Sequence, residues 1–177
     1  ASRRERGDRA GIAKGLDTIS LVHQARGNYS AALAAVSESL ELRREFALVH
    51  PIAESLNNIA VIYEAQGDYA QAARSLREAL ALNTDKVGSA SLNLEIQTHL
   101  GAVLLRQGRP TQAIQLLTAA VAAPGATAFA FQLADARYTL GRALVAGRRL
   151  AEARTVFDQA LALRDSQHDR EGRALLL

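Results

Sequence analysis

Apolar residues recur along this chain at the spacing of amphipathic helices, and residues 56–82 give the clearest example. One apolar face begins at Leu56 and a second begins at Tyr69, on either side of a turn at Gly67. Apolar positions three and four residues apart lie on one face of an α-helix. The stretch therefore predicts two amphipathic helices joined by a short turn.

The same pattern returns at residues 16–42, 97–123 and 137–163. Equivalent positions step by 40, 41 and 40 residues along the chain. One such set is small and lies in the first helix of each pair: Ser20, Ala60, Gly101 and Gly141. Another is large and lies in the second helix: Val36, Leu76, Leu117 and Phe157. A fixed period of this length indicates a stack of helical repeats, in which each unit buries its apolar face against its neighbours.

We therefore expect an all-α fold, a right-handed superhelical α-solenoid of antiparallel helix pairs with four repeats and a partial fifth. The predicted single domain, 1–177, has repeats over about 9–47, 49–86, 88–124 and 126–166, with a partial helix over 168–177. Residues Arg3–Leu16 resemble Arg164–Leu177 at an offset of four periods. This similarity leads us to expect a piece of a larger protein.

Glycine marks the turn inside the first three repeats, at Gly27, Gly67 and Gly108. Glycine ends a helix at low cost because it adopts positive φ readily. The fourth repeat has Arg148 at this position, with Gly147 one place early. We expect the fourth turn to be the least regular.

The best-matched repeat resembles the tetratricopeptide repeat family. The resemblance is carried by Ile59-Ala60, Tyr63, Gly67, Tyr69, Ala72 and Ala79. The period of about 40 is similar to the longer-repeat branch found in kinesin light chains and many bacterial regulatory proteins. The family's tryptophan position departs from the pattern and holds Leu16, Leu56, Gln97 and Arg137. The resemblance implies a groove, on the inner face, that binds extended peptides or partner helices.

A second stripe, roughly opposite the buried one, runs along the first helix of every repeat and stacks into one surface. We call it the polar stripe, and the resemblance implies that it lines the groove. Its candidate binding residues are Lys14, Asp17, Thr18, Leu21, Glu54, Asn57, Asn58, Val61, Glu95, Thr98, His99, Asp135, Tyr138 and Arg142, and Ala102 and Thr139 complete the pattern.

Two parts of the polar stripe stand out. The amides of Asn57 and Asn58 can both donate to and accept from a peptide backbone. Tyr138 and Arg142 lie one turn apart and suit an anchor and a carboxylate contact, because aromatics and arginine often carry interface energy. Two plainer interpretations stay open: the stripe is only the solvated face of each helix, and Tyr138 only packs under a stacked arginine.

The sequence offers few residues that could carry out catalysis or bind a metal. The chain has no cysteine and no nucleophile, nucleotide-binding or zinc-protease motif. His23 falls on the buried stripe, where we expect a packing role, and the four histidines share no helical turn, so we expect no metal and no cofactor. Glu38, Glu41 and Glu45 lie on one helix beside Arg43-Arg44 and are interpreted as a solvated ion-pair face.

The charge pattern disfavours a nucleic-acid partner. The formal net charge is +3, and acids interleave with the basic residues. A nucleic-acid surface would need clustered positive charge and stacking aromatics. No run of apolar residues is long enough to span a membrane, and we expect a cytoplasmic location.

We accordingly expect no enzyme, but a protein- or peptide-binding scaffold module of a larger, bacterial, regulatory or signalling protein. The first alternative is a structural scaffold that self-associates through the terminal helix ending in Leu175–Leu177. The less favoured alternative is a nucleic-acid-binding helical repeat.

Overall fold

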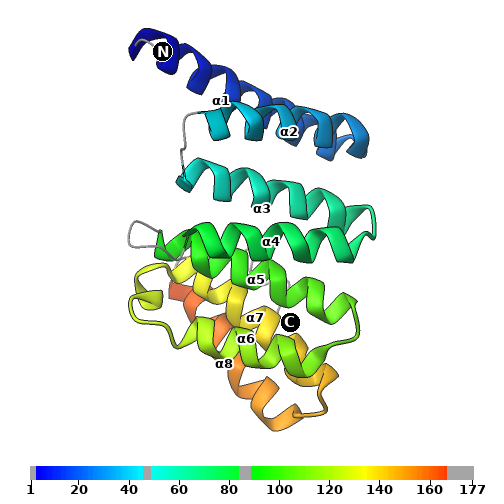
Figure 1. Cartoon of the computed structure of the whole chain (residues 1–177). Coiled ribbons are helices and arrows are strands. Elements are labelled where there is room, and N and C mark those ends of the chain that lie inside the picture. Colours follow the sequence, from blue (N-terminus) through cyan, green and yellow to red (C-terminus); the bar gives the residue numbers. More distant parts are fainter. Residues whose placement is uncertain (1–2, 46–48, 84–88, 167–177) are drawn as a thin grey trace. The chain divides into compact units, whose positions relative to one another are not determined.

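The computed structural model describes residues 3–45, 49–83 and 89–166, and the side-chain surroundings of residues 8–45, 50–83 and 89–165 (Figure 1). Over these ranges the chain is helical without strands, which confirms the all-α prediction. The predicted partial helix 168–177 lies outside the described residues. The helices are α1 (Arg3–Ala25), α2 (Tyr29–Glu45), α3 (Val49–Ala65), α4 (Tyr69–Asn83), α5 (Ala90–Arg106), α6 (Pro110–Val121), the short 3-10 helix η1 (Ala126–Ala128), α7 (Ala130–Ala146) and α8 (Leu150–Ser166).

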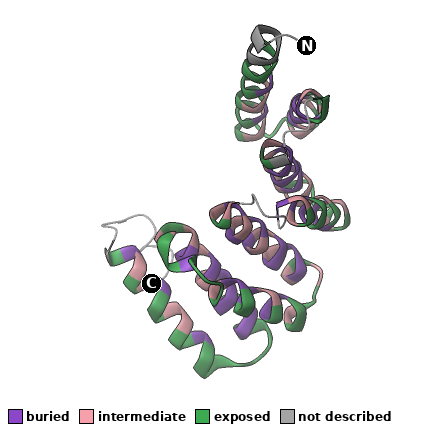
Figure 2. Cartoon of the chain, turned by 60° about the vertical axis from the view of Figure 1, so that its left-hand side comes forward, coloured by how far each residue is buried: buried purple, intermediate pink, exposed green. Residues whose placement is uncertain are grey.

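The chain forms two compact units, residues 1–88 and 89–177. In the first unit, α1 packs on α2, α2 on α3 and α3 on α4. In the second, α5 packs on α6, α6 on α7 and α7 on α8, and α5 also contacts α7. Within each unit, buried residues lie along the sides where these helices face one another (Figure 2). Each unit is therefore a stack of antiparallel helix pairs of the solenoid type.

The two helices of a pair approach closely at the small position of the first helix. Ser20 and Ala60 are almost fully buried. In the second unit, a methyl group added to Gly101 would lie 2.7 Å from Leu117 Cδ1, and one added to Gly141 would overlap the ring of Phe157. Glycine stands opposite Leu117 and Phe157 in the second unit, whereas Ala60 holds the same position in the second repeat, where the aligned large residue is Leu76. This complementarity fixes the spacing of the pair.

The fourth turn corrects one expectation, because it is as regular as the other three. Arg149 N donates to Leu144 O at 2.8 Å, as Arg109 N donates to Leu104 O at 2.9 Å in the third turn. Arg148 has a φ of 60° and takes the place of Gly108, whose φ is 69°. The hydrogen bonds of the turn impose the left-handed conformation on whichever residue stands there. The arginine bears a steric cost that glycine would avoid.

We expect Arg148→Gly to raise the free energy of unfolding by about 0.5–1 kcal/mol, because glycine relieves the left-handed strain but is more flexible in the unfolded chain. Urea unfolding followed by circular dichroism measures the change. Gly108→Arg is the reciprocal control and should lower stability by about 1–2 kcal/mol. Equal stability of wild type and Arg148→Gly would contradict this prediction, because the strain relieved would then do no more than offset the flexibility of glycine in the unfolded chain.

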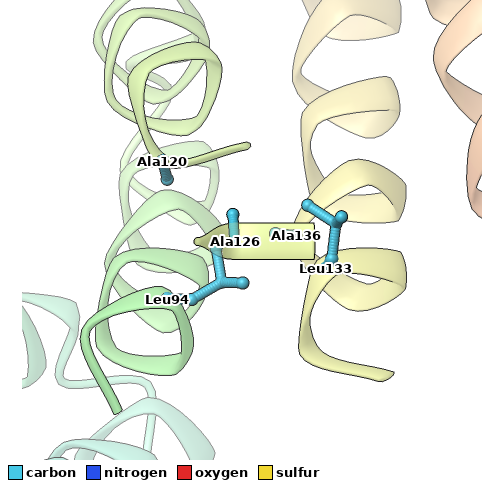
Figure 3. Close-up of a cluster of buried hydrophobic side chains, with 5 residues drawn as sticks. All are labelled: Leu94, Ala120, Ala126, Leu133 and Ala136. Carbon is cyan, nitrogen blue, oxygen red and sulfur yellow. The ribbon is translucent and has the colours of Figure 1, made fainter. Parts of the chain in front are cut away.

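A buried apolar cluster fixes α5 and α7 against one another in the second unit (Figure 3). Leu94 comes from α5, Ala126 from η1, and Leu133 and Ala136 from α7, with Ala120 at the end of α6. Pro124 disfavours helical backbone at the residue before it, in keeping with the end of α6 at Val121. The 3-10 helix then inserts Ala126 between the longer helices. The cluster thus sets the position of the polar side chains beside it on α5 and α7.

Within the described ranges, no helix combines the length and apolar character needed to cross a membrane.

Candidate binding surface

In the second unit, residues of the polar stripe line an open pocket of about 220 Å³ between α5 and α7. Its lining is Glu95, Thr98, His99, Gln132, Asp135, Tyr138 and Thr139. All of these except Gln132 belong to the stripe identified from the sequence. The structure therefore brings together side chains that lie up to 44 positions apart in the chain.

The pocket is small, and residues with polar side chains line it. Thr98 is 8% exposed, and its hydroxyl donates to Leu94 O at 2.7 Å, so this side chain serves the helix backbone. The remaining functional groups around it are two carboxylates, an imidazole, a phenol, the carboxamide of Gln132 and the hydroxyl of Thr139. Sites that enclose a small molecule are usually larger, about 300–1,000 Å³. The volume suits one side chain of a larger partner better than a whole ligand.

Asp135 is held in place from α8. Arg164 donates from Nη2 to Asp135 Oδ1, and its own side chain is buried. The Arg164 guanidinium also lies over the ring of Phe131, with Cζ 4.3 Å from the ring centroid. Contact with a planar aromatic and a carboxylate is typical of arginine. The carboxylate of Asp135 thus has a fixed direction at the pocket wall.

Tyr138 is fixed in a similar way. Its ring centroid lies 5.8 Å from that of Phe157, and Arg142 Cζ lies 5.9 Å from it on the same helix. Tyr138 therefore packs beneath Arg142, and the binding role expected for Tyr138 stays a prediction. Tyr138 nevertheless lines the pocket, whereas Arg142 is exposed beside it. Packing against Phe157 lowers the entropy that the tyrosine would lose on contact with a partner.

The first unit has a pocket of about 300 Å³ between α1 and α3, with Arg43 of α2 also in its lining. Lys14 and Glu54 are the stripe residues that line it, and Glu54 Oε1 lies 3.3 Å from His50 Nε2. The other lining residues are Ala10, Gly11, Ala13 and Pro51. The stripe residues Thr18, Leu21, Asn58 and Val61 lie outside this pocket, the first two exposed and the last two half-buried.

Two predicted stripe residues of the first unit turn inward instead. Asn57 is 2% exposed, so its amide is not presented to a ligand in this structure. Asp17 accepts a hydrogen bond from Arg43 Nη2, and its side chain is 16% exposed. The stripe was drawn from a helical wheel, which does not show that a residue from the second helix reaches the same side.

Arg43 of α2 is the residue that reaches this side of α1. Its burial corrects the interpretation that Arg43 and Arg44 both belong to a solvated ion-pair face. Arg43 is 7% exposed and donates to Asp17, to Pro51 O at 2.8 Å and to Ser55 Oγ at 2.5 Å. It thereby joins α1, α2 and α3. Arg44, by contrast, is exposed and pairs with Glu41 at 3.1 Å and Glu78 at 3.0 Å, as expected of a surface ion pair.

Sequence reasoning thus missed Gln132 and the role of Arg43. Gln132 could have been found, because it lies three residues before Asp135 and extends the stripe by one turn. Arg43 and Arg164 occupy equivalent positions three repeats apart, and both bind an aspartate of the stripe. That recurrence was visible in the sequence once the repeats were aligned. The expectation that His23 packs in a half-buried position is confirmed.

Among the described side chains, no group of three or more histidines, aspartates and glutamates is arranged to hold a metal ion.

Family models match most of the chain. Models described as tetratricopeptide repeat match residues 11–85, 51–125 and 100–168. No curated protein sequence matches.

Solved structures share the fold. A putative kinesin light chain with nearly identical TPR-like repeats from Podosopora anserina is 20% identical, with a TM-score of 0.71 over 88% of this chain and 76% of that one. MamA from Desulfovibrio magneticus is 22% identical, with a TM-score of 0.62 over 93% and 90%. YrrB, described as a TPR protein with an unusual peptide-binding site, is 19% identical, with a TM-score of 0.56 over 91% and 80%.

Proposed function

Because the chain belongs to the tetratricopeptide repeat family, we propose that it binds a protein or peptide partner through the pocket between α5 and α7. Such repeats typically mediate binding to proteins or peptides, and the family is generally non-catalytic. The proposal for this chain is a non-catalytic scaffold module without a cofactor.

The observation that supports the proposal is the coincidence of the polar stripe with the pocket. In the second unit the stripe residues converge on a concave site, where Glu95, His99 and Asp135 are half-buried rather than part of the core. Concave sites with a few fixed polar groups are the usual places for ligand recognition. The contacts of Tyr138 with Phe157 and of Asp135 with Arg164 hold two of these groups in place before any partner binds.

The stripe residues of the first unit, apart from Asp17 and Asn57, form a second, looser candidate surface. Lys14 and Glu54 line its pocket, and Leu21 is 57% exposed. We further propose that the four repeats belong to a single domain of a larger bacterial regulatory or signalling protein located in the cytoplasm. YrrB, whose description includes a peptide-binding site, supports peptide recognition by analogy of fold alone.

The proposal is tested with a random peptide library displayed on phage and selected against the full chain. We expect enriched peptides to bind in fluorescence anisotropy, and Tyr138→Ala to weaken binding by about tenfold or more, because a buried aromatic contact is worth about 1–2 kcal/mol. Gln115→Ala is the matched control, since Gln115 is exposed on α6 and lies outside the pocket lining.

Two results would contradict the proposal. One is that no peptide is enriched above a blank surface. The other is that enriched peptides bind Tyr138→Ala and wild type equally. Retention on single-stranded RNA that falls steeply with salt would favour the nucleic-acid alternative instead.

A further inference from the structure

Helix α1 exposes apolar side chains at positions that are buried on α3 and α7. Ile12, Ile19 and Val22 are 53%, 48% and 45% exposed. Forty residues later, on α3, the equivalent Ile52, Ile59 and Ile62 are 8%, 6% and 0% exposed. The equivalents on α7 are likewise buried: Leu133, Leu140 and Ala143. Figure 2 shows the same contrast along α1 and α3.

These residues share one face with a glycine and two charges. Successive residues of an α-helix are about 100° apart, so Asp8, Ile12, Gly15, Ile19, Val22 and Arg26 all fall within an arc of about 80°. Arg26 follows the end of α1, but its amide still donates to Val22 O at 3.2 Å in the helical pattern. All six residues are exposed. We call this arc the α1 face.

We propose that two copies of the chain associate through their α1 faces, with the two helices antiparallel about a two-fold axis. In this arrangement Asp8 of one copy faces Arg26 of the other, Ile12 faces Val22, and Gly15 faces Ile19. The residue numbers of every facing pair add up to the same total, which is the condition for an antiparallel contact about a two-fold axis. Each pair then occurs twice in the dimer.

The α1 face complements itself in charge and in shape. It carries an acid at one end and a base at the other, so antiparallel pairing places opposite charges together, whereas parallel pairing would place like charges together. A side chain on Gly15 would meet nothing within 4 Å, so Ile19 of the second copy has room to pack there. The equivalents of Gly15 in the other repeats, Ser55, Ile96 and Ala136, have side chains and are fully buried within one copy.

A second copy is therefore favoured over a different helix on this face. A foreign helix or a preceding repeat could cover Ile12 and Ile19, but nothing in that arrangement requires the charges of Asp8 and Arg26 to match across a two-fold axis. A single helix pair buries less area than a standard stable interface of about 1,200–2,000 Å². The dimer is accordingly weak and reversible, and its formation depends on concentration. It also differs from self-association through residues 168–177, because it needs none of them.

The first test measures the mass of the full chain by sedimentation equilibrium from about 1 to about 500 µM, where an interface of this size dissociates. Wild type should shift from monomer to dimer over this range. Ile19→Asp should raise the dissociation constant by about thirtyfold or more, because it places two charges in an apolar contact. Leu21→Asp is the matched control on the same helix: Leu21 is 57% exposed but lies opposite the α1 face, so the dimer should be unchanged.

The second test exchanges the charges. Asp8→Arg and Arg26→Asp should each weaken dimerisation by about tenfold, because each change sets like charges opposite one another twice. The double variant should regain wild-type affinity, and the two single variants mixed together should form a heterodimer. A monomeric wild type at every concentration would overturn the proposal. So would a dimer that survives Ile19→Asp, or a double variant no better than the single ones, since either would place the contact elsewhere or in another orientation.

Discussion

Replacing Arg43 by alanine is expected to lower the free energy of unfolding by about 3 kcal/mol, the range observed when one partner of a buried ion pair is removed. Arg43 is 7% exposed and bonds to groups on two other helices. Its removal leaves Asp17 charged and mostly buried, with one carboxylate oxygen already lacking a hydrogen-bond partner among the described residues. It also removes the side-chain donor that bonds to Pro51 O and Ser55 Oγ.

Arg44→Ala is the matched control, one residue away. Arg44 is exposed, and loss of its pairs with Glu41 and Glu78 should cost less than about 0.5 kcal/mol. Replacing Arg43 and Asp17 together by leucine should recover most of the loss, because a buried pair can often be replaced by apolar residues. Chemical unfolding of wild type and the three variants measures these differences. If Arg43→Ala costs no more than Arg44→Ala, the proposed bridge between α1, α2 and α3 does not hold these helices.

Gly141→Ala is expected to lower the free energy of unfolding by about 2 kcal/mol, because overpacking in a close-packed core costs about 1–3 kcal/mol. The result is notable because alanine is the better helix former by about 1 kcal/mol. The added methyl group would overlap the ring of Phe157, a rigid side chain that also contacts Tyr138. The sign of the effect therefore depends on packing between α7 and α8.

A glycine in open space gives the opposite sign. Nothing lies within 4 Å of a methyl group added to Gly11, so Gly11→Ala should raise stability by about 0.5–1 kcal/mol. Phe157→Leu should restore part of the stability of Gly141→Ala, because it recreates the combination of Ala60 and Leu76 found in the second repeat. A stabilising Gly141→Ala would show that the two helices are not in close contact there.

The repeat pattern was sufficient to predict the helices, the places of the turns and most of the buried positions. Apolar spacing and a constant period depend on residues within one or two turns, and helix pairs depend mainly on such local contacts. The pairing of small and large positions, such as Gly141 with Phe157, was present in the sequence as two separate sets. The structure shows that their members touch.

The candidate site was predicted less completely, because its geometry depends on side chains from several helices. A helical wheel placed Asn57 and Asp17 on the polar stripe, but a wheel treats each helix as if it were isolated. Arg43 reaches Asp17 from α2, and Asn57 is buried. The second unit agrees better with the prediction because η1 and the apolar cluster at Leu94 leave the stripe residues of α5 and α7 around an open pocket.

The most direct test of the proposed binding surface is a map of backbone amide chemical shifts as a selected peptide is added to the isotope-labelled chain. The largest changes are expected at the pocket lining, from Glu95 to His99 on α5 and from Gln132 to Thr139 on α7. Changes concentrated instead on α6 and on the outer side of α8, with the pocket residues unaffected, would contradict binding through the polar stripe.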